Sequence, residues 1–182
     1  MEHLSDKELL ELFHKGDKKH YVFNLLVRKY QTRIYSHIRR ILISHDDTND
    51  VVQNTFLKVW QNLDKFREDS QFYTWLYRIA TNEALNFLKQ KRTKFLIPFI
   101  SVEKQLANTL KEDPYFKGDA IQRKLQLAIL HLPEKQRIVF NMKYFEGMKY
   151  EDMSEILGTS VGALKASYHI AVKKIENILT AD

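Results

Sequence analysis

Polar side chains recur every four residues in one stretch of this sequence, and basic side chains follow them. The recurring residues are Thr74, Arg78, Asn82 and Asn86. The basic residues are Lys89, Lys91, Arg92 and Lys94. In a helix, this spacing places the first group on one face. Amides can hydrogen-bond base edges and cations can pair with phosphates, so the pattern suits a nucleic acid. The alternative is a solvated face with a basic last turn.

A helix must position these side chains. Apolar residues keep helical spacing on its opposite side: Phe72, Trp75, Leu76, Ile79, Ala80, Phe87 and Leu88. We expect them to face a core, and we expect Ser70 to cap the helix.

Composition limits the classes of function. The chain has 182 residues, of which 44% are hydrophobic, with only five Gly and three Pro. Together with long patterns of period 3.6, this predicts an all-α protein. A net charge of +6 favours an anionic partner. The absence of Cys excludes disulfides, cysteine zinc sites and a thiol nucleophile. No apolar run approaches about 18 residues, so we expect no membrane insertion and a cytoplasmic protein.

Three further helices are expected in the first third of the chain. The first begins with a capping box of Ser5 and Glu8, ends at Gly16, and buries Leu9, Leu12 and Phe13. The second spans residues 18–43. The third spans residues 50–63 and follows the sequence HDDTND, which we interpret as a polar cap. The pair His45-Asp46 allows a metal phosphohydrolase as an alternative, but no further ligands have suitable spacing, so no metal is expected.

The helical pattern stops between residues 93 and 118, where Pro98, Pro114 and Gly118 occur. We predict a linker with an apolar segment, residues 95–102, that docks on one of the domains. A helix with Ile121 on its apolar face follows. Residues 150–174 then predict a helix-turn-helix with its turn at Gly158 and a cap at Thr159 or Ser160.

The stretch F-R-x-x-S-x-F-x-T-W-L-Y-R-I-A-x-N, beginning at Phe66, resembles the signature of region two of bacterial sigma-70-type sigma factors in the extracytoplasmic-function (ECF) group. The resemblance implies that this part captures the minus-ten promoter element as it melts, with a base flipped into the loop at 66–71. The residues that it implies are Arg67, Ser70, Tyr73, Arg78, Asn82, Asn86, Lys89 and Arg92.

A second motif, D-x-x-Q-x-T-F-x-x-x-W from Asp50, is similar to the segment with which sigma factors bind core RNA polymerase. The implied contact residues are Asp50, Gln53, Asn54, Leu57 and Lys58. Asn54 stands where the family commonly has Glu, so one charge of that contact is missing.

The C-terminal part resembles sigma region four through LPEKQR and L-G-x-S-x-G-x-[VL]-K. It implies minus-thirty-five recognition in duplex DNA by Thr159, Ser160, Gly162, Lys165, Ala166 and His169. The sequence departs from the family where Asp152-Met153-Ser154 replaces E-I-A, and where habitual arginines are replaced by Ser167, Ile170 and Val172.

The resemblance therefore implies two small helical domains, residues 1–92 and 119–182, joined by a flexible linker at 93–118. Core RNA polymerase, promoter DNA and an anti-sigma factor are the implied partners. We expect no catalysis and no cofactor. A stand-alone helix-turn-helix regulator that binds duplex DNA as a dimer is the alternative, and it leaves residues 66–92 unexplained.

Overall fold

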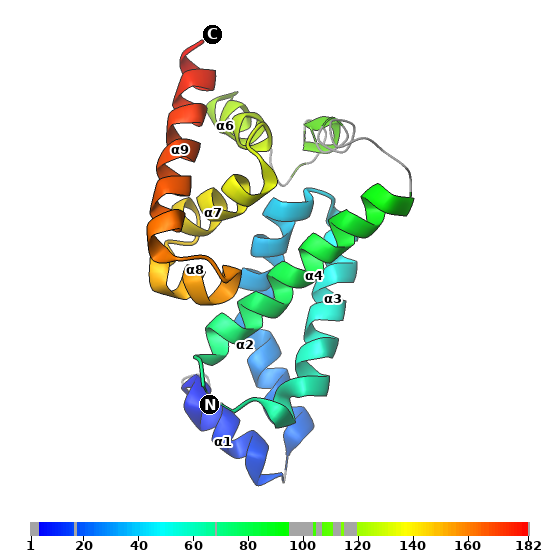
Figure 1. Ribbon diagram of the computed structural model, residues 1–182. Helices are drawn as coiled ribbons and strands as arrows, with labels where there is room; N and C mark the ends of the chain where they lie inside the picture. The colour runs from blue at the N-terminus through cyan, green and yellow to red at the C-terminus, as the bar shows by residue number, and fades with distance from the viewer. Residues whose placement is uncertain are drawn as a thin grey trace.

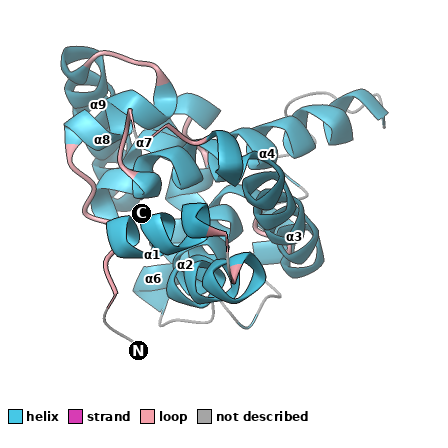
Figure 2. Ribbon diagram, turned by 90° about the horizontal axis from the view of Figure 1, so that it is seen from below, coloured by secondary structure: helices cyan, strands magenta, loops and turns pink. Residues whose placement is uncertain are grey.

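The computed structural model describes residues 4–16, 18–67, 69–94, 104, 107–110, 114 and 120–181. Within these residues the regular structure is helical and no strand occurs (Figures 1 and 2). An N-terminal unit contains α1, α2, α3 and α4, and a C-terminal unit contains α6, α7, α8 and α9. The all-α prediction is confirmed.

Helix α1 (Asp6–Lys15) begins and ends as the sequence predicts. Ser5 and Glu8 form a reciprocal capping box, and Gly16 ends the helix with φ +90°, a conformation that L side chains rarely adopt. Its buried face contains Leu9, Leu10 and Phe13. Leu12 was expected there but is 42% exposed, and Leu10 is buried instead.

Helices α2 (Lys19–Leu42) and α3 (His45–Asn62) form the centre of the N-terminal unit. The predicted start of α3 at Asp50 was wrong. Ser44 caps the helix through its hydroxyl, which accepts a hydrogen bond from the Asp47 N–H at 3.3 Å. The polar residues after it therefore form the first turn, where acidic side chains suit the helix dipole. The short 3-10 helix η1 (Leu63–Lys65) follows.

Helix α4 (Phe72–Lys94) crosses α2 and α3 (Figure 1). Its buried residues are Phe72, Thr74, Leu76, Tyr77, Ala80, Thr81, Ala84 and Leu88. The helix begins at Phe72, so Gln71 rather than Ser70 is the residue before it.

The C-terminal unit consists of α6 (Ala120–Leu130), α7 (Glu134–Tyr144), α8 (Tyr150–Leu157) and α9 (Val161–Thr180). The middle of helix α7, residues 137–142, is buried, and the helix packs against α2 and α9. Ile121 was expected to face the core and is instead 75% exposed. Among the described residues, the buried side chains of α6 are those at its C-terminal end, Ala128, Ile129 and Leu130.

Between the two units, Leu110 is buried with Ile43 and Leu130. A described part of the predicted linker thus packs where α2 and α6 end. The apolar segment at 95–102, which was predicted to dock, lies outside the described residues.

The two units share one apolar core. Met148, Met153 and Ile156 of the C-terminal unit belong to the same cluster of buried residues as Leu76 and Tyr77 of α4. Helices α4 and α8 lie side by side (Figures 1 and 2). Among the described helices, none is long and apolar enough to cross a membrane.

Candidate nucleic-acid interface

Aromatic side chains fix both ends of the loop that precedes α4. The ring centroid of Phe66 lies 4.8 Å from that of Trp75 and 6.0 Å from that of Phe72. Phe66 and Phe72 are buried, whereas Arg67 and Gln71 between them are exposed. A loop anchored in this way presents its polar residues with little loss of conformational freedom on binding.

A cavity of about 700 Å³ lies beside this loop. Its walls come from α1, α2, the loop and α8, and are lined by Ser5, Asp6, Lys7, Leu10, Lys29, Phe66, Asp69, Ser70, Gln71, Phe72 and Glu155. Ser70, predicted as a base-binding residue, is therefore at a cavity large enough for a nucleobase.

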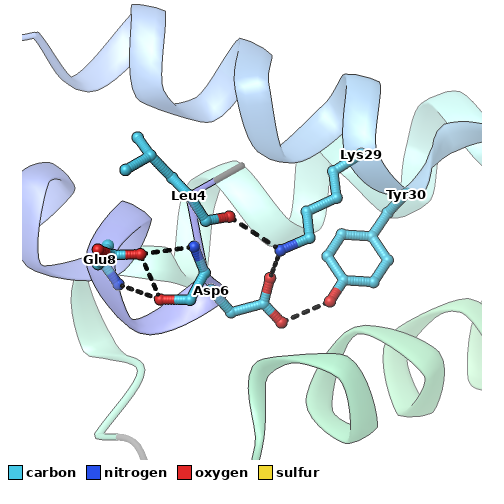
Figure 3. A network of polar contacts seen from close by, with 6 residues as sticks. Leu4, Asp6, Glu8, Lys29 and Tyr30 are labelled. Atoms are coloured by element: carbon cyan, nitrogen blue, oxygen red, sulfur yellow. Dashed lines mark hydrogen bonds and ion pairs between the residues drawn. The ribbon is translucent and has the colours of Figure 1, made fainter. Parts of the chain in front are cut away.

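A polar network holds the α1 wall of this cavity in place (Figure 3). Lys29 Nζ lies 2.7 Å from Asp6 Oδ1 and donates to the carbonyl of Leu4 at 3.2 Å. The Tyr30 hydroxyl donates to Asp6 Oδ2. Burial, reinforced by that carboxylate, raises the pKa of Tyr30, so its phenol remains a donor.

The polar face of α4 carries three of the four predicted stripe residues. Asn82 and Asn86 are exposed and Arg78 is half-buried. Thr74 is 1% exposed, and its hydroxyl donates to the carbonyl of Gln71 at 2.8 Å. The prediction that Thr74 belongs to the polar stripe was therefore wrong. A second cavity, of about 510 Å³, is lined by Asn86, Lys89, Gln90 and Thr93.

Three predicted minus-ten residues face the C-terminal unit. Arg78 Nε donates to the carbonyl of Glu155 at 3.0 Å, and Arg92 pairs with Glu134. Tyr73 is half-buried with its ring centroid 4.6 Å from that of Tyr77. Burial, together with the carboxylates of Glu146 and Asp152 in the C-terminal unit, raises the pKa of Tyr73 to about 12.

The outward face of α3 groups the predicted polymerase-binding residues. Asp50, Gln53, Asn54, Leu57 and Lys58 are all exposed. Leu57 is 54% exposed among these polar side chains, and Lys58 pairs with Glu83 of α4. An exposed leucine on a polar helix face suits a protein partner better than DNA.

The predicted helix-turn-helix is confirmed in α8 and α9. Gly158 makes the turn with φ +64°, and the Ser160 hydroxyl caps α9 by accepting from the Ala163 N–H at 3.3 Å. Thr159 is half-buried at the turn. The first turns of α9 expose Ser160, Gly162, Lys165, Ala166 and His169. In such units, this end of the second helix enters the major groove.

In the part of the chain that the structure describes, no group of three or more His, Cys, Asp or Glu side chains could hold a metal ion. His45, the candidate ligand, is instead bonded to Tyr35 Oη at 2.7 Å and to Asn49 Nδ2 at 3.1 Å.

Comparison with known proteins agrees with this geometry. The family model for sigma-70 region 2 matches residues 26–94, and that for sigma-70 region 4 matches residues 122–175. The chain is 32% identical to the ECF RNA polymerase sigma-E factor of Haemophilus influenzae, over 97% of this chain and 96% of that protein. It is 35% identical to the sigma-E factor of Escherichia coli K12, over 97% and 95%. The chain belongs to the ECF group of the sigma-70 family.

This sigma factor also shares its fold with solved structures. It matches CnrH, solved in complex with the cytosolic domain of CnrY, with a TM-score of 0.71 and 25% identity, over 97% of this chain and 98% of that chain. It matches the sigma factor RpoE of Bartonella quintana, solved with the anti-sigma factor NepR, with a TM-score of 0.68 and 20% identity, over 88% and 98%. As a sigma factor the chain acts in transcription initiation with RNA polymerase and promoter DNA, and sigma factors are not enzymes.

Sequence reasoning about this sigma factor missed the residues that join its two units. His37, Glu146 and Glu155 lie at the junction. His37 stands among the apolar positions of α2, and this was the available signal that its ring is buried. Glu146 lies in a turn, where sequence carries no information about a partner 109 residues away.

Proposed function

We propose that the exposed face of α3 is the surface through which this sigma factor binds core RNA polymerase. The observation that supports it is Leu57, 54% exposed and surrounded by Asp50, Gln53 and Asn54. An apolar anchor within a polar rim is the usual composition of a protein–protein contact. Lys58 lies at the edge of this surface, where its pairing with Glu83 orients it.

For the minus-ten element, we infer that the loop at 66–71 and the polar face of α4 bind the melted strand. Ser70 and the 700 Å³ cavity would receive a flipped base. Arg67 and Tyr73, which do not line this cavity, would contact the strand on either side of it. Asn82 and Asn86 would contact base edges, and Arg78, Lys89 and Arg92 would contact phosphates. Stacking contributes about 1–3 kcal/mol per captured base, which is enough to trap spontaneous openings of the duplex.

The minus-thirty-five element would be bound as duplex DNA, with the exposed end of α9 in its major groove. Ser160 and Thr159 would contact the backbone, and Lys165, Ala166 and His169 the groove. The missing arginines at 167, 170 and 172 reduce the number of phosphate contacts. Lys174 donates to Gln136 at 3.1 Å, so its charge is held toward α7.

These roles correspond to a polymerase-binding and minus-ten domain at residues 1–92, a linker at 93–118 and a minus-thirty-five domain at 119–182. Because transcription takes place there, we infer that the protein acts in the cytoplasm. An anti-sigma factor is a further proposed partner, since both solved relatives were captured with a bound protein. A stand-alone regulator leaves the face of α3 without a role, and it is not favoured.

Affinity capture of core RNA polymerase tests the α3 surface. The wild-type protein should retain core enzyme stoichiometrically, and the variant Asp50→Ala with Gln53→Ala should lose most of it. The control carries Glu11→Ala with Gln31→Ala, which removes the same charge and amide from exposed positions on α1 and α2. Equal retention by both double variants would refute the assignment of this surface.

A further inference from the structure

A further cavity lies where the two units meet, and it shares no lining residue with the cavity beside Ser70. This junction cavity has a volume of about 390 Å³. Its walls come from α2, from α4 and from the turn between α7 and α8, and are lined by Thr32, Arg33, Ser36, Arg40, Tyr73, Tyr77, Phe145 and Glu146. Small-molecule sites typically occupy about 300–1,000 Å³ and often lie between domains. The junction cavity is therefore large enough for a small organic ligand.

Two arginines of α2 give the junction cavity its charge. Arg33 is exposed and Arg40 is half-buried, and seven residues of helix place them about 10 Å apart along the axis. Among the described residues, no carboxylate forms an ion pair with either guanidinium. The carboxylate in the wall, that of Glu146, lies instead against His37, with Oε1 2.7 Å from Nδ1 of the ring. The cavity therefore suits an anionic ligand.

Tyr73 and Tyr77 of α4 add neutral hydrogen-bond donors to the wall. Burial, reinforced by nearby carboxylates, raises the pKa of Tyr73 to about 12 and also raises the pKa of Tyr77, so both phenols keep their protons at neutral pH. The positive charge of Arg33 acts on both pKa values in the opposite direction, so its guanidinium lies within electrostatic reach of both hydroxyls. A guanidinium and phenol hydroxyls around one space are donors suited to a phosphate group.

Flat groups line the other end of the junction cavity. The guanidinium of Arg40 lies 4.5 Å from the ring centroid of Phe145. Arg40 Nη1 also donates to the carbonyl of Ser36 at 3.3 Å, which holds the guanidinium in this position. Aromatic rings and guanidinium planes are the groups on which unpaired nucleobases stack in proteins. One end of the cavity thus suits a phosphate and the other end suits a base.

We propose that the junction cavity binds a free nucleotide, with the phosphate at Arg33 and the base beside Arg40 and Phe145. The separation of about 10 Å between the two arginines suits a ligand that carries its anionic group at one end and its ring at the other. The inference goes beyond the proposed function, because neither promoter DNA nor polymerase takes part in it. Of the residues that line the cavity, Tyr73 alone also belongs to the proposed minus-ten surface.

Isothermal titration calorimetry of the free 182-residue chain with AMP, GMP, CMP and UMP tests the proposal. At least one of the four nucleotides should bind with one-to-one stoichiometry. It should bind at least tenfold more tightly than ribose 5-phosphate, which lacks the base, and more tightly than inorganic phosphate by at least the same factor. If no nucleotide binds more tightly than these two smaller phosphates, the proposal is overturned.

Arg33→Ala tests the phosphate end of the junction cavity. The variant should bind the nucleotide at least tenfold more weakly than the wild type, because it lacks the guanidinium that pairs with the phosphate. Arg28→Ala is the matched control, since it removes the same charge from another exposed position on α2 that does not line the cavity. Circular dichroism confirms that both variants are folded. Equal affinities of Arg33→Ala and Arg28→Ala would overturn the proposal.

Two variants without any change of charge test whether the nucleotide lies in the junction cavity. Phe145→Leu keeps an apolar side chain but removes the ring, so it should weaken binding of the nucleotide and leave the affinity for ribose 5-phosphate unchanged. Thr32→Trp places a bulky ring at an exposed position of the cavity wall and should block binding of both ligands. If both variants bind the nucleotide as the wild type does, the ligand lies elsewhere on the protein, and the proposal is overturned.

These measurements use the free protein, so their failure and the failure of the proposed function are distinguishable. Loss of nucleotide binding would leave the polymerase-binding face of α3 unaffected. Failure to retain core polymerase would likewise leave the nucleotide site unaffected.

Discussion

Glu146 and His37 meet across the junction of the two units, with Oε1 of Glu146 2.7 Å from Nδ1 of the ring. Apolar contact lies beside it, because Met148, Met153 and Ile156 belong to the same buried cluster as the core of the N-terminal unit. His37 is 1% exposed, and a buried polar group left without its partner is costly, so this contact favours the orientation in which the two units are docked here.

Leu57 should contribute to polymerase binding without contributing to stability. It is 54% exposed, so Leu57→Ser should change the free energy of unfolding by less than about 0.5 kcal/mol. The affinity of the Leu57→Ser variant for core polymerase should fall at least tenfold. This corresponds to a loss of about 1.4 kcal/mol or more in binding free energy, as expected for an apolar anchor of an interface. Leu12→Ser is the control, since Leu12 is 42% exposed on α1. Similar losses in both variants, measured by fluorescence anisotropy, would contradict the α3 assignment.

Gly162 offers a test that separates stability from DNA binding. A Cβ at this helical position would meet no atom within 4 Å, so Gly162→Ala should stabilise α9 by up to about 1 kcal/mol. Duplex affinity should nevertheless fall, because the methyl group would stand between α9 and the DNA. Gly16→Ala should do the reverse: its φ of +90° makes alanine strained, by about 1 kcal/mol or more, without affecting duplex binding. Urea unfolding and gel-shift titration measure the two quantities.

Lys165 should supply one phosphate contact of the minus-thirty-five unit. It is exposed on α9, with its ammonium 5.7 Å from the ring centroid of Tyr150. Lys165→Ala should lower the slope of log K against log salt by about 0.9 on random-sequence duplex DNA. Lys15→Ala, which removes the same charge from α1, should leave the slope unchanged. An unaltered slope for Lys165→Ala would remove that residue from the interface.

The stability of the protein at alkaline pH should depend on the environment of Tyr73. Its pKa is raised from 10.0 to about 12, first by burial and then by Glu146 and Asp152. Because the pKa is raised in the folded state, the protonated phenol of Tyr73 contributes to the free energy of unfolding. That contribution is complete below pH 10 and is lost between pH 10 and about 12. Tyr73→Phe cannot ionise and should retain up to about 2 kcal/mol more of its stability there. The free energies of unfolding of both proteins are measured in urea at pH 9 to 11. If they fall equally, Tyr73 is not buried beside these two carboxylates.

Much of this fold could be predicted from the sequence because its signals are local. The capping box at Ser5, the turn at Gly158 and the helical spacing of the residues beginning at Phe72 each act within a few residues. The predictions were wrong at positions where neighbouring residues in the folded structure determine whether a side chain is buried. Thr74 has the spacing of a surface residue, yet its hydroxyl satisfies the Gln71 carbonyl and turns inward.

The candidate site was less predictable than its helices. The exposed α3 and α9 residues follow from amphipathic patterns, and the structure places them as expected. The contact of Arg78 with Glu155 joins residues 77 positions apart, and the ring of His37 reaches a carboxylate 109 positions away. No local pattern encodes such pairs, because they depend on how two separately patterned units dock.

The central claim, that this chain directs RNA polymerase to promoters, is tested most directly by transcription from a library of random DNA upstream of a constant reporter. Core polymerase is supplied with or without the protein, and transcript ends are sequenced. We expect discrete start sites that appear only with the protein and that share two upstream elements. Asp50→Ala with Gln53→Ala should strongly reduce transcription from these sites. Identical start sites with and without the protein, under conditions in which it binds the core enzyme, would contradict the central claim.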